Sequence, residues 1–329
     1  MPYSIALVGC GLAAELFHVP ALRAMADRLH VRWVVDPRAD RRQLIGAMLP
    51  GEPELLPDPD ALDTGGREPD LVVLASPTAS HVPLLADHFR GAAILCEKPV
   101  AARAAQARTA LQRRSAGAIP AGPVAVVHSE LFRPAVARLL TLLDTGVIGR
   151  AHTVNAGHHL TAPPEHVPQR LPWRLAPDGG GVLADLAYHL AYLSVAVLGR
   201  PLASTQALFA TPPGAVVEHE ALVHLAGVSG TEATIEVSWL AATPRWWLAV
   251  DGTQGAIRVD DYRQLKVCGP DGLWRAEPVD EPAGGHYSAL YAAAADALAT
   301  GHAPGTPADA GLQVLDLLDS ARSIAVERG

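Results

Sequence analysis

Short apolar runs alternate with helix-like segments in the first third of the chain. The runs are apolar at most positions, which is typical of strands buried on both faces. They predict strands at residues 4–8, 31–36, 70–75 and 92–96. Helices are predicted from about residue 13, with Pro20 kinking or ending the first part, and at 79–90 and 101–116. Strands alternating with helices predict a parallel sheet covered on both faces.

The rest of the chain shows longer stretches of alternating apolar and polar residues, which predict a mostly antiparallel sheet. The predicted strands are 124–130, 151–157, 202–210, 216–226, 231–240, 246–250, 255–260 and 264–268. The predicted helices are 134–146, 182–198, 286–300 and 308–327. Because Gly and Pro gather between residues 117 and 123, we place a boundary there. The chain is thus expected to be an α/β protein with domains 1–120 and 121–329.

Composition narrows the possible partners. Apolar residues make up 49% of the chain and charged residues 18%, which is enough for a large core. The net charge of −8 argues against nucleic acid as a general partner. No apolar run approaches the roughly 20 residues that span a membrane, and no secretion signal is visible, so we expect a cytoplasmic protein. Cys10, Cys96 and Cys268 lie far apart, without metal-ligand spacing.

A glycine-rich loop between the first strand and the first helix predicts a dinucleotide site. Gly9 can make the tight turn, and Gly11 lets the backbone approach a pyrophosphate. The helix start at Leu12 and Ala13 then offers N–H groups to the anion. Asp36, at the end of the second strand, is placed to accept hydrogen bonds from a ribose. The alternative is an ordinary glycine turn followed by an Asp before Pro37.

The same carboxylate bears on the choice of cofactor. Asp36 would repel a 2′-phosphate, so NAD is favoured and NADP is possible. Arg38, with Arg41 or Arg42, could reverse this by pairing with the phosphate, although a solvated loop accounts for these arginines more simply.

Polar residues follow the next two strands, at the sheet edge where such cofactors bind. They are Ser76, Pro77, Thr78 and His81 after the fourth predicted strand, and Glu97 and Lys98 after the fifth. We predict that they line the cofactor crevice, with helix capping as the alternative for Ser76 and Thr78.

Together these motifs resemble a known family. GCGLAA at 9–14, SPTASH at 76–81, EKP at 97–99 and GGGVLADLAYH at 179–189 are similar to the glucose–fructose oxidoreductase, inositol dehydrogenase and MocA-like (Gfo/Idh/MocA) pattern. The resemblance extends over 131–152, PWR at 172–174, GTQGAIRV at 252–259 and the last helix.

The resemblance implies a Rossmann-type N-terminal domain and a C-terminal α/β domain with a large open, mostly antiparallel sheet. It implies an NAD(P)-dependent enzyme that transfers hydride between the cofactor and a hydroxyl or keto carbon of a sugar, sugar derivative or cyclitol. It assigns catalysis to Lys98, Asp185 and His189, and puts Arg174 near the substrate. It also implies a homodimer or homotetramer formed through the C-terminal sheet, whose uncovered face would otherwise expose apolar surface.

Helical spacing supports part of this assignment. Asp185 and His189 are four residues apart, so both lie on one helical face, and Tyr192 continues it. Asp185 can orient His189 as an acid or base, while Lys98 polarises the reacting oxygen; the roles of Lys98 and His189 could be exchanged. The plainer alternatives are an Asp that supports the helix start, a packed His and a solvated Lys.

Two departures from the family leave the substrate open. Tyr192 stands where many members have an acid, and His158 and His159 lie in a region that shapes substrate choice. We predict that these three contact substrate, and that no metal is bound. Other functions on this scaffold are an imine or dihydrodiol reductase and a non-catalytic dinucleotide-sensing regulator.

Overall fold

The structure is a computed structural model that describes residues 1–63, 68–89, 91–116, 121–161, 172–177, 180–199, 201–280 and 284–328. The chain forms two compact units. The first contains Met1–Ser129 and Pro282–Leu312, and the second contains Glu130–Glu281 and Gln313–Gly329.

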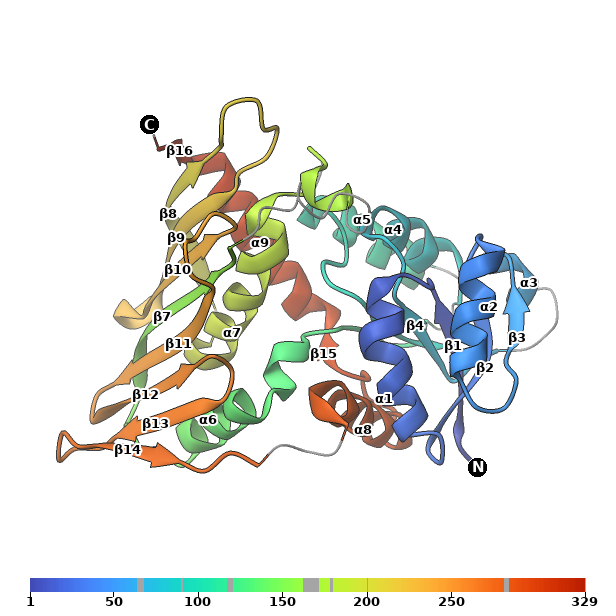
Figure 1. Ribbon diagram of the computed structural model, residues 1–329, viewed down its shortest axis with the longest axis horizontal. Coiled ribbons are helices and arrows are strands. Elements are labelled where there is room, and N and C mark those ends of the chain that lie inside the picture. Colours follow the sequence, from blue (N-terminus) through green and yellow to red (C-terminus); the bar gives the residue numbers. More distant parts are fainter. Residues whose placement is uncertain are drawn as a thin grey trace. The chain divides into compact units, whose positions relative to one another are not determined.

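A seven-stranded sheet forms the centre of the first unit (Figure 1). Its order is β15-β6-β5-β4-β1-β2-β3, parallel except for β15. The strands are β1 (Tyr3–Val8), β2 (Leu29–Val35), β3 (Glu54–Leu56), β4 (Leu71–Leu74), β5 (Ala93–Cys96), β6 (Val124–Val126) and β15 (Thr306–Pro307). Every residue of β4 and β5 is buried, as expected for central strands with helices on both faces. The predicted parallel sheet is confirmed.

The helices of this unit include one element of unusual geometry. A π-helical turn, η1 (Ala14–His18), leads directly into α1 (Val19–Ala24). A proline has no N–H and crowds the carbonyl four residues earlier, so the wider turn accommodates Pro20 without ending the helix. The other helices are α2 (Ala39–Met48), α3 (Asp60–Asp63), α4 (Thr78–Asp87), α5 (Ala104–Ser115) and α8 (Gly285–Ala299).

The first unit extends beyond the predicted domain 1–120. β6 continues the parallel sheet next to β5, and β15 pairs with β6 from the far end of the sequence. Helix α8 packs against α1. The compact units therefore differ from the predicted boundaries, because a segment near the C-terminus returns to the first sheet.

A nine-stranded sheet forms the second unit, in the order β14-β13-β12-β11-β7-β10-β9-β8-β16. Only the β7–β10 and β8–β16 pairs are parallel, so the predicted mostly antiparallel sheet is confirmed. The strands are β7 (Ala151–His159), β8 (Leu202–Ala210), β9 (Glu220–Gly227), β10 (Glu232–Ser238), β11 (Arg245–Gly252), β12 (Gly255–Asp260), β13 (Gln264–Cys268), β14 (Trp274–Glu277) and β16 (Val326–Glu327).

Helices pack on one face of this sheet. They include α6 (Pro134–Asp144), the π-helical turn η5 (Leu183–Ala187) with α7 (Tyr188–Leu198), and α9 (Ala308–Ile324). Short 3-10 turns are η2 (Ser129–Phe132), η4 (Pro172–Leu175) and η6 (Val228–Gly230). Among the described residues no helix is long and apolar enough to cross a membrane.

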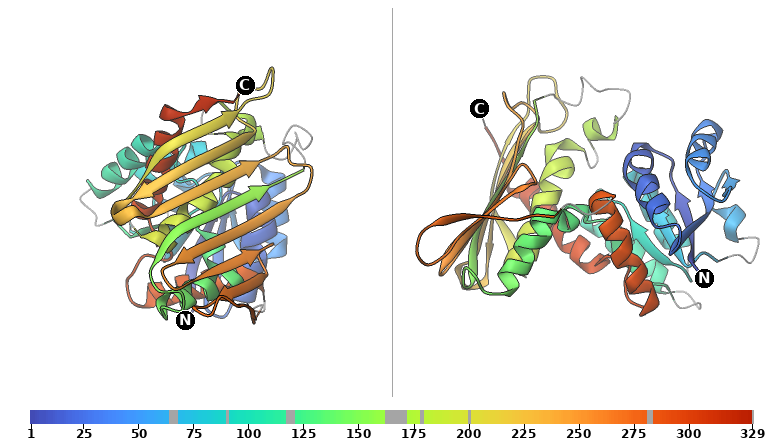
Figure 2. Two further views of the ribbon diagram at one scale, coloured as in Figure 1. Left: turned by 90° about the vertical axis from the view of Figure 1, so that its left-hand side faces the viewer. Right: turned by 60° about the horizontal axis from the view of Figure 1, so that its bottom comes forward.

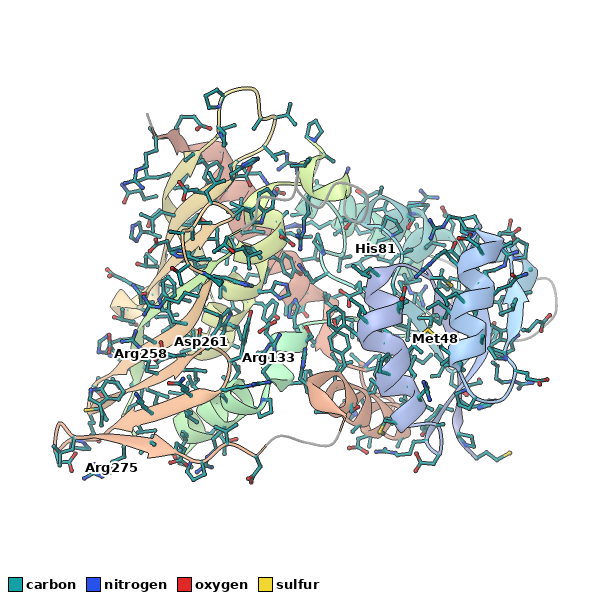
Figure 3. All side chains as sticks on the ribbon, in the orientation of Figure 1. Met48, His81, Arg133, Arg258, Asp261 and Arg275 are labelled. Carbon is teal, nitrogen blue, oxygen red and sulfur yellow. The ribbon has the colours of Figure 1, made fainter. Side chains whose placement is uncertain are left out.

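Within the described residues the other face of the sheet has no helix over it (Figure 2, left). Its side chains are mostly polar and pair across the strands, which corrects the expectation of an exposed apolar face. The pairs across strands are His159–Glu236, Ser238–Glu220, His224–Thr234 and Asn155–Trp247, and Arg258 pairs with Asp260 along β12; Figure 3 labels Arg258.

Candidate active site

The glycine loop follows β1 and is packed against the loop after β4. Gly9 has a φ of +99°, and a Cβ there would lie 2.4 Å from the backbone N of Ser76. Only glycine fits this position. A Cβ on Gly11 would come no closer than 4.0 Å to the carbonyl oxygen of Ala75, so the space beside Gly11 is open. The helix beginning at Leu12 and Ala13 aims its first N–H groups toward this end of the sheet. This cradle fits a pyrophosphate.

Asp36 lies directly at this loop. Its Oδ2 accepts the Cys10 N–H at 2.8 Å, and its Oδ1 accepts the Arg38 N–H at 2.9 Å. Each carboxylate oxygen has a second lone pair, so these bonds still leave acceptor capacity for a ribose. The carboxylate thus stands where the sequence placed it for NAD.

The neighbouring arginines support the loop. Arg41 donates to the Cys10 carbonyl at 2.8 Å and forms an ion pair with Glu15 at 2.7 Å. Arg42 donates to the backbone carbonyl of Asp36. Both therefore have structural partners, whereas the Arg38 side chain is exposed.

His81 links the loops after β4 and β5. It lies on α4, is labelled in Figure 3 and is 1% exposed. One ring nitrogen is 2.8 Å from the Ser76 carbonyl and the other is 3.0 Å from the Pro99 carbonyl. A neutral imidazole has one N–H, so His81 donates to one of these carbonyls while its other nitrogen lies against the second. The buried ring packs between the two loops, and its predicted cofactor contact stays a prediction. Burial lowers its pKa, which makes a charged imidazole unfavourable.

The predicted capping alternative for Ser76 and Thr78 also differs from the structure. Pro77 occupies the position before α4 and Thr78 is the first helical residue, without a side-chain cap. The Ser76 hydroxyl instead pairs with that of Ser80 at 2.7 Å.

The loop after β5 carries Lys98, and the peptide bond to Pro99 is cis. The Lys98 N–H donates to Glu97 Oε2 at 3.0 Å. Lys98 is one of only two lysines in the chain, the other being Lys266, beside 24 arginines. Lysine, unlike arginine, can lose its proton in a protein, so Lys98 has the chemistry that proton transfer at this loop would need.

Asp185 lies in the second unit, in the π-helical turn η5, and is 4% exposed. Its Oδ2 accepts the Trp239 indole N–H at 3.2 Å and lies 3.0 Å from Arg174 Nε. The predicted Arg174 is thus beside the predicted Asp185. Trp239 is a partner that the sequence did not indicate, because it lies 54 residues downstream at the end of β10.

The start of this helix is supported by Glu218 and not by Asp185. Glu218 Oε1 accepts the Leu183 N–H at 3.0 Å, and its backbone carbonyl accepts the Val182 N–H. Burial raises the pKa of Glu218, partly offset by hydrogen bonds to its carboxylate from the backbone of Glu218 itself and of Leu183. The plain structural role considered for Asp185 therefore belongs to another residue.

The structure shows a contact between His189 and Tyr192, whereas the predicted partner of His189 was Asp185. The His189 Nδ1 lies 3.0 Å from the Tyr192 hydroxyl, which also accepts the Glu130 N–H at 3.0 Å. Tyr192 is 2% exposed, so its hydroxyl sits behind the imidazole. Tyr192, in the place of the acid found in many family members, positions His189 without adding a negative charge.

The two adjacent histidines of β7 face opposite sides of the sheet, because successive strand residues alternate. His158 contacts Tyr262 on the helix-covered side, with ring centroids 6.1 Å apart. His159 lies on the uncovered side, 3.3 Å from Glu236. The helix carrying Asp185 and His189 is on the His158 side, so the placement of His159 corrects the prediction that both histidines serve one substrate pocket.

Comparisons with known proteins agree with this geometry. A profile described as "Oxidoreductase family, NAD-binding Rossmann fold" matches residues 3–116, and "GFO/IDH/MocA C-terminal domain" matches residues 136–258. Inositol 2-dehydrogenase 2 of Saccharopolyspora erythraea is 30% identical over 170 residues, 51% of this chain and 48% of that protein. The chain spans about half the length of the curated relatives it matches.

Solved structures share the fold over the whole chain. An oxidoreductase from Agrobacterium radiobacter, in complex with NAD+, L-tartaric acid and magnesium, has a TM-score of 0.82 at 22% identity, over 98% of this chain and 97% of that one. The 3-ketoreductase KijD10 from Actinomadura kijaniata, with NADP and TDP-benzene, has a TM-score of 0.81 at 20% identity, over 99% of each chain.

Proposed function

Because the chain belongs to the Gfo/Idh/MocA oxidoreductase family, we propose that it transfers hydride between NAD(H) and a hydroxyl or keto carbon of a sugar, sugar derivative or cyclitol. The observation that carries the proposal is the position of Lys98, on the loop after β5 at the edge of the parallel sheet where dinucleotides bind. NAD, when bound, supplies the hydride acceptor.

In this proposal Lys98, Asp185 and His189 act on one substrate. His189 exchanges the hydroxyl proton and is held by Tyr192, while Lys98 polarises the reacting oxygen or shares that proton. Asp185 holds Arg174, whose guanidinium and the His158 ring are the proposed substrate contacts. We include Asp185 in the proposed catalytic group, as predicted; its side chain contacts Arg174 and Trp239.

The test is an assay of NAD and NADP reduction at 340 nm over a panel of sugars, sugar acids and inositols. On a substrate found this way, His189→Ala and Lys98→Ala should each lower turnover by roughly 10²–10⁴-fold. Lys98→Arg separates the two roles of Lys98, because arginine keeps the charge but does not release a proton. Lys266→Arg is the matched control.

Full activity of both alanine variants would refute the catalytic assignment. NADH binding without turnover of any compound in the panel would favour the dinucleotide-sensing function instead.

The same proposal extends to the setting and the assembly. All three cysteines are free thiols, which supports a reducing compartment such as the cytoplasm. We also propose a homodimer or homotetramer through the uncovered face of the nine-stranded sheet.

A further inference from the structure

A buried polar cluster in the first unit contacts Glu97, the residue that precedes Lys98. His18 from η1 places Nε2 3.0 Å from Glu97 Oε1, and the Tyr287 hydroxyl donates to the same oxygen at 3.1 Å. The His18 Nδ1 is 2.7 Å from the Tyr291 hydroxyl. His18 and Tyr291 are 0% exposed, and Tyr287 is 9% exposed. A polar cluster this deep is stable only when its members satisfy one another.

The hydrogen bonds to Glu97 have a defined direction. Burial, the largest single influence, raises the pKa of Glu97, but the bond and charge of His18, with Lys98 and Tyr287, outweigh it and leave that pKa below its ordinary value. Glu97 is therefore a carboxylate, and His18 must donate to it from Nε2. Burial also raises the pKa of Tyr291 well above its ordinary value, so its phenol stays protonated and remains hydrogen-bonded to His18 Nδ1.

Elements that lie far apart in the sequence contribute the residues of this cluster. The π-helical turn at Ala14–His18 brings His18 into the core, and π-helical turns often occur at functional sites. Both tyrosines come from α8, about 190 residues downstream of Glu97, in the segment that returns to the first unit. The rings of Tyr287 and Tyr291 also stand edge-on to His18, at 5.2 and 5.9 Å.

We propose that His18, Tyr287 and Tyr291 are positioning residues for Lys98, acting through Glu97. One oxygen of Glu97 receives His18 and Tyr287, and the other fixes the Lys98 backbone N–H. The cluster thus holds a negative charge that interacts electrostatically with the Lys98 side chain, and it anchors the loop that carries Lys98. The inference rests on the proposed function only for the catalytic role of Lys98.

A second titratable group of this unit that interacts with Lys98 is His128, which follows β6. Burial, with a smaller effect of Lys98, lowers the pKa of His128 to about 3, so it is uncharged at neutral pH. Glu97 is the negatively charged group described beside this loop, at the end of β5, and it is contacted by His18 on η1 and Tyr287 on α8. Removing a donor to Glu97 leaves its burial in place, so its pKa should rise.

The experiment uses the chain's two lysines. With ¹³Cε-labelled lysine the protein gives two side-chain signals, and Lys98→Arg assigns them; exposed Lys266 is the internal reference. In His18→Asn and Tyr287→Phe, the Lys98 signal should gain an inflection between about pH 5 and 8, as Glu97 becomes protonated. Tyr291→Phe should have a smaller effect of the same kind. Glu97→Gln should lower the alkaline midpoint of Lys98 by about one pH unit or more.

Two controls assign the inflection. It should vanish in the double variant Tyr287→Phe/Glu97→Gln, and it should be absent from Ser288→Ala, which removes a buried hydrogen bond to Gly284 on the same helix. NADH binding checks that each variant is folded, and the conservative tyrosine variants keep the test informative if His18→Asn does not fold.

If the Lys98 titration in Tyr287→Phe, Tyr291→Phe and Glu97→Gln matches that of Ser288→Ala, the proposal is wrong. The titration needs no substrate, so its outcome is independent of whether the proposed reaction is found. Conversely, absence of turnover leaves the titration result standing.

Discussion

At the residue scale, Asp36 is the carboxylate that we expect to determine the preference between NAD and NADP, which differ by one phosphate. We predict a preference for NAD, because Arg41 is paired with Glu15 and Arg42 with a backbone carbonyl. Asp36→Ala should relax the preference for NADH over NADPH by about tenfold or more, which corresponds to about 1.4 kcal/mol. Calorimetric titration with both cofactors measures this.

A matched charge change separates the local effect from a general one. Asp40→Asn removes an exposed acid four residues away on α2 and should leave the preference unchanged. Tighter NADPH than NADH binding in the unmodified protein would show that Arg38 outweighs Asp36.

His128 makes the stability of the first unit depend on pH. Its folded pKa is about 3, against 6.5 for an ordinary histidine, so below pH 6.5 only the unfolded chain takes up the proton. Stability should therefore be fully present above pH 6.5 and fall toward acid, by up to about 1.4 kcal/mol per pH unit from this residue. Urea unfolding at several values between pH 7.5 and 5 measures the slope.

Replacement identifies the histidine responsible. His128→Gln should make the slope shallower, whereas His302→Gln, which replaces an exposed histidine of the same unit, should not. An unchanged slope in His128→Gln would mean that the acid sensitivity arises elsewhere, with buried His81 the next residue to replace.

At the element scale, the two loop glycines have separable functions. Gly9→Ala should destabilise the protein by at least about 1–3 kcal/mol, because the residue has φ +99° and no room against the Ser76 backbone. Gly11→Ala should leave the free energy of unfolding nearly unchanged, yet weaken NADH binding by tenfold or more, since its Cβ enters the cradle. Urea unfolding and NADH titration of both variants test this. Equal losses of stability would contradict it.

How far the elements could be predicted depended on their periodicity. Most strands of both sheets were predicted because burial imposes regular patterns. The short strands β3, β14, β15 and β16 were not, and β16 lies where the last predicted helix was expected to continue. Helix α2 was not predicted, since Ile45 is its one buried residue among those described, and it has no clear apolar face. The π-helical turns at η1 and η5 were not predicted either, because their pattern of apolar residues is typical of an ordinary α-helix.

The same limit explains what sequence reasoning missed in the site. Lys98, Asp36 and the glycines were predicted because they follow strands in order. The partners Trp239, Glu218 and Tyr287 come from distant elements, and no local spacing marks a contact made only through the tertiary fold. For His158 and His159, strand alternation was the available signal, and it predicts the opposite faces that the structure shows.

At the scale of the whole molecule, the uncovered face of the second sheet carries a charge pattern suited to pairing with itself. Strands β9 and β10 carry Glu220, Glu232 and Glu236, while Arg245, Arg258 and Lys266 stand on β11, β12 and β13, with β7 between them. A two-fold axis at β7 would lay the basic strands of one copy over the acidic strands of the other. Asp251 and Asp260 reduce the basic charge, so polar and shape contacts must contribute too.

Charge reversal tests this arrangement. We expect an oligomer at micromolar concentration by light scattering, weakened by Glu232→Lys/Glu236→Lys and by Arg245→Glu/Arg258→Glu, because each double variant places like charges opposite one another. An equimolar mixture of the two variants should associate again, since each then offers the other a complementary half. Arg108→Glu, an exposed change on α5 of the first unit, should have no effect. A monomer in the unmodified protein would refute the assembly, and association unaffected by either reversal would place the interface on another surface.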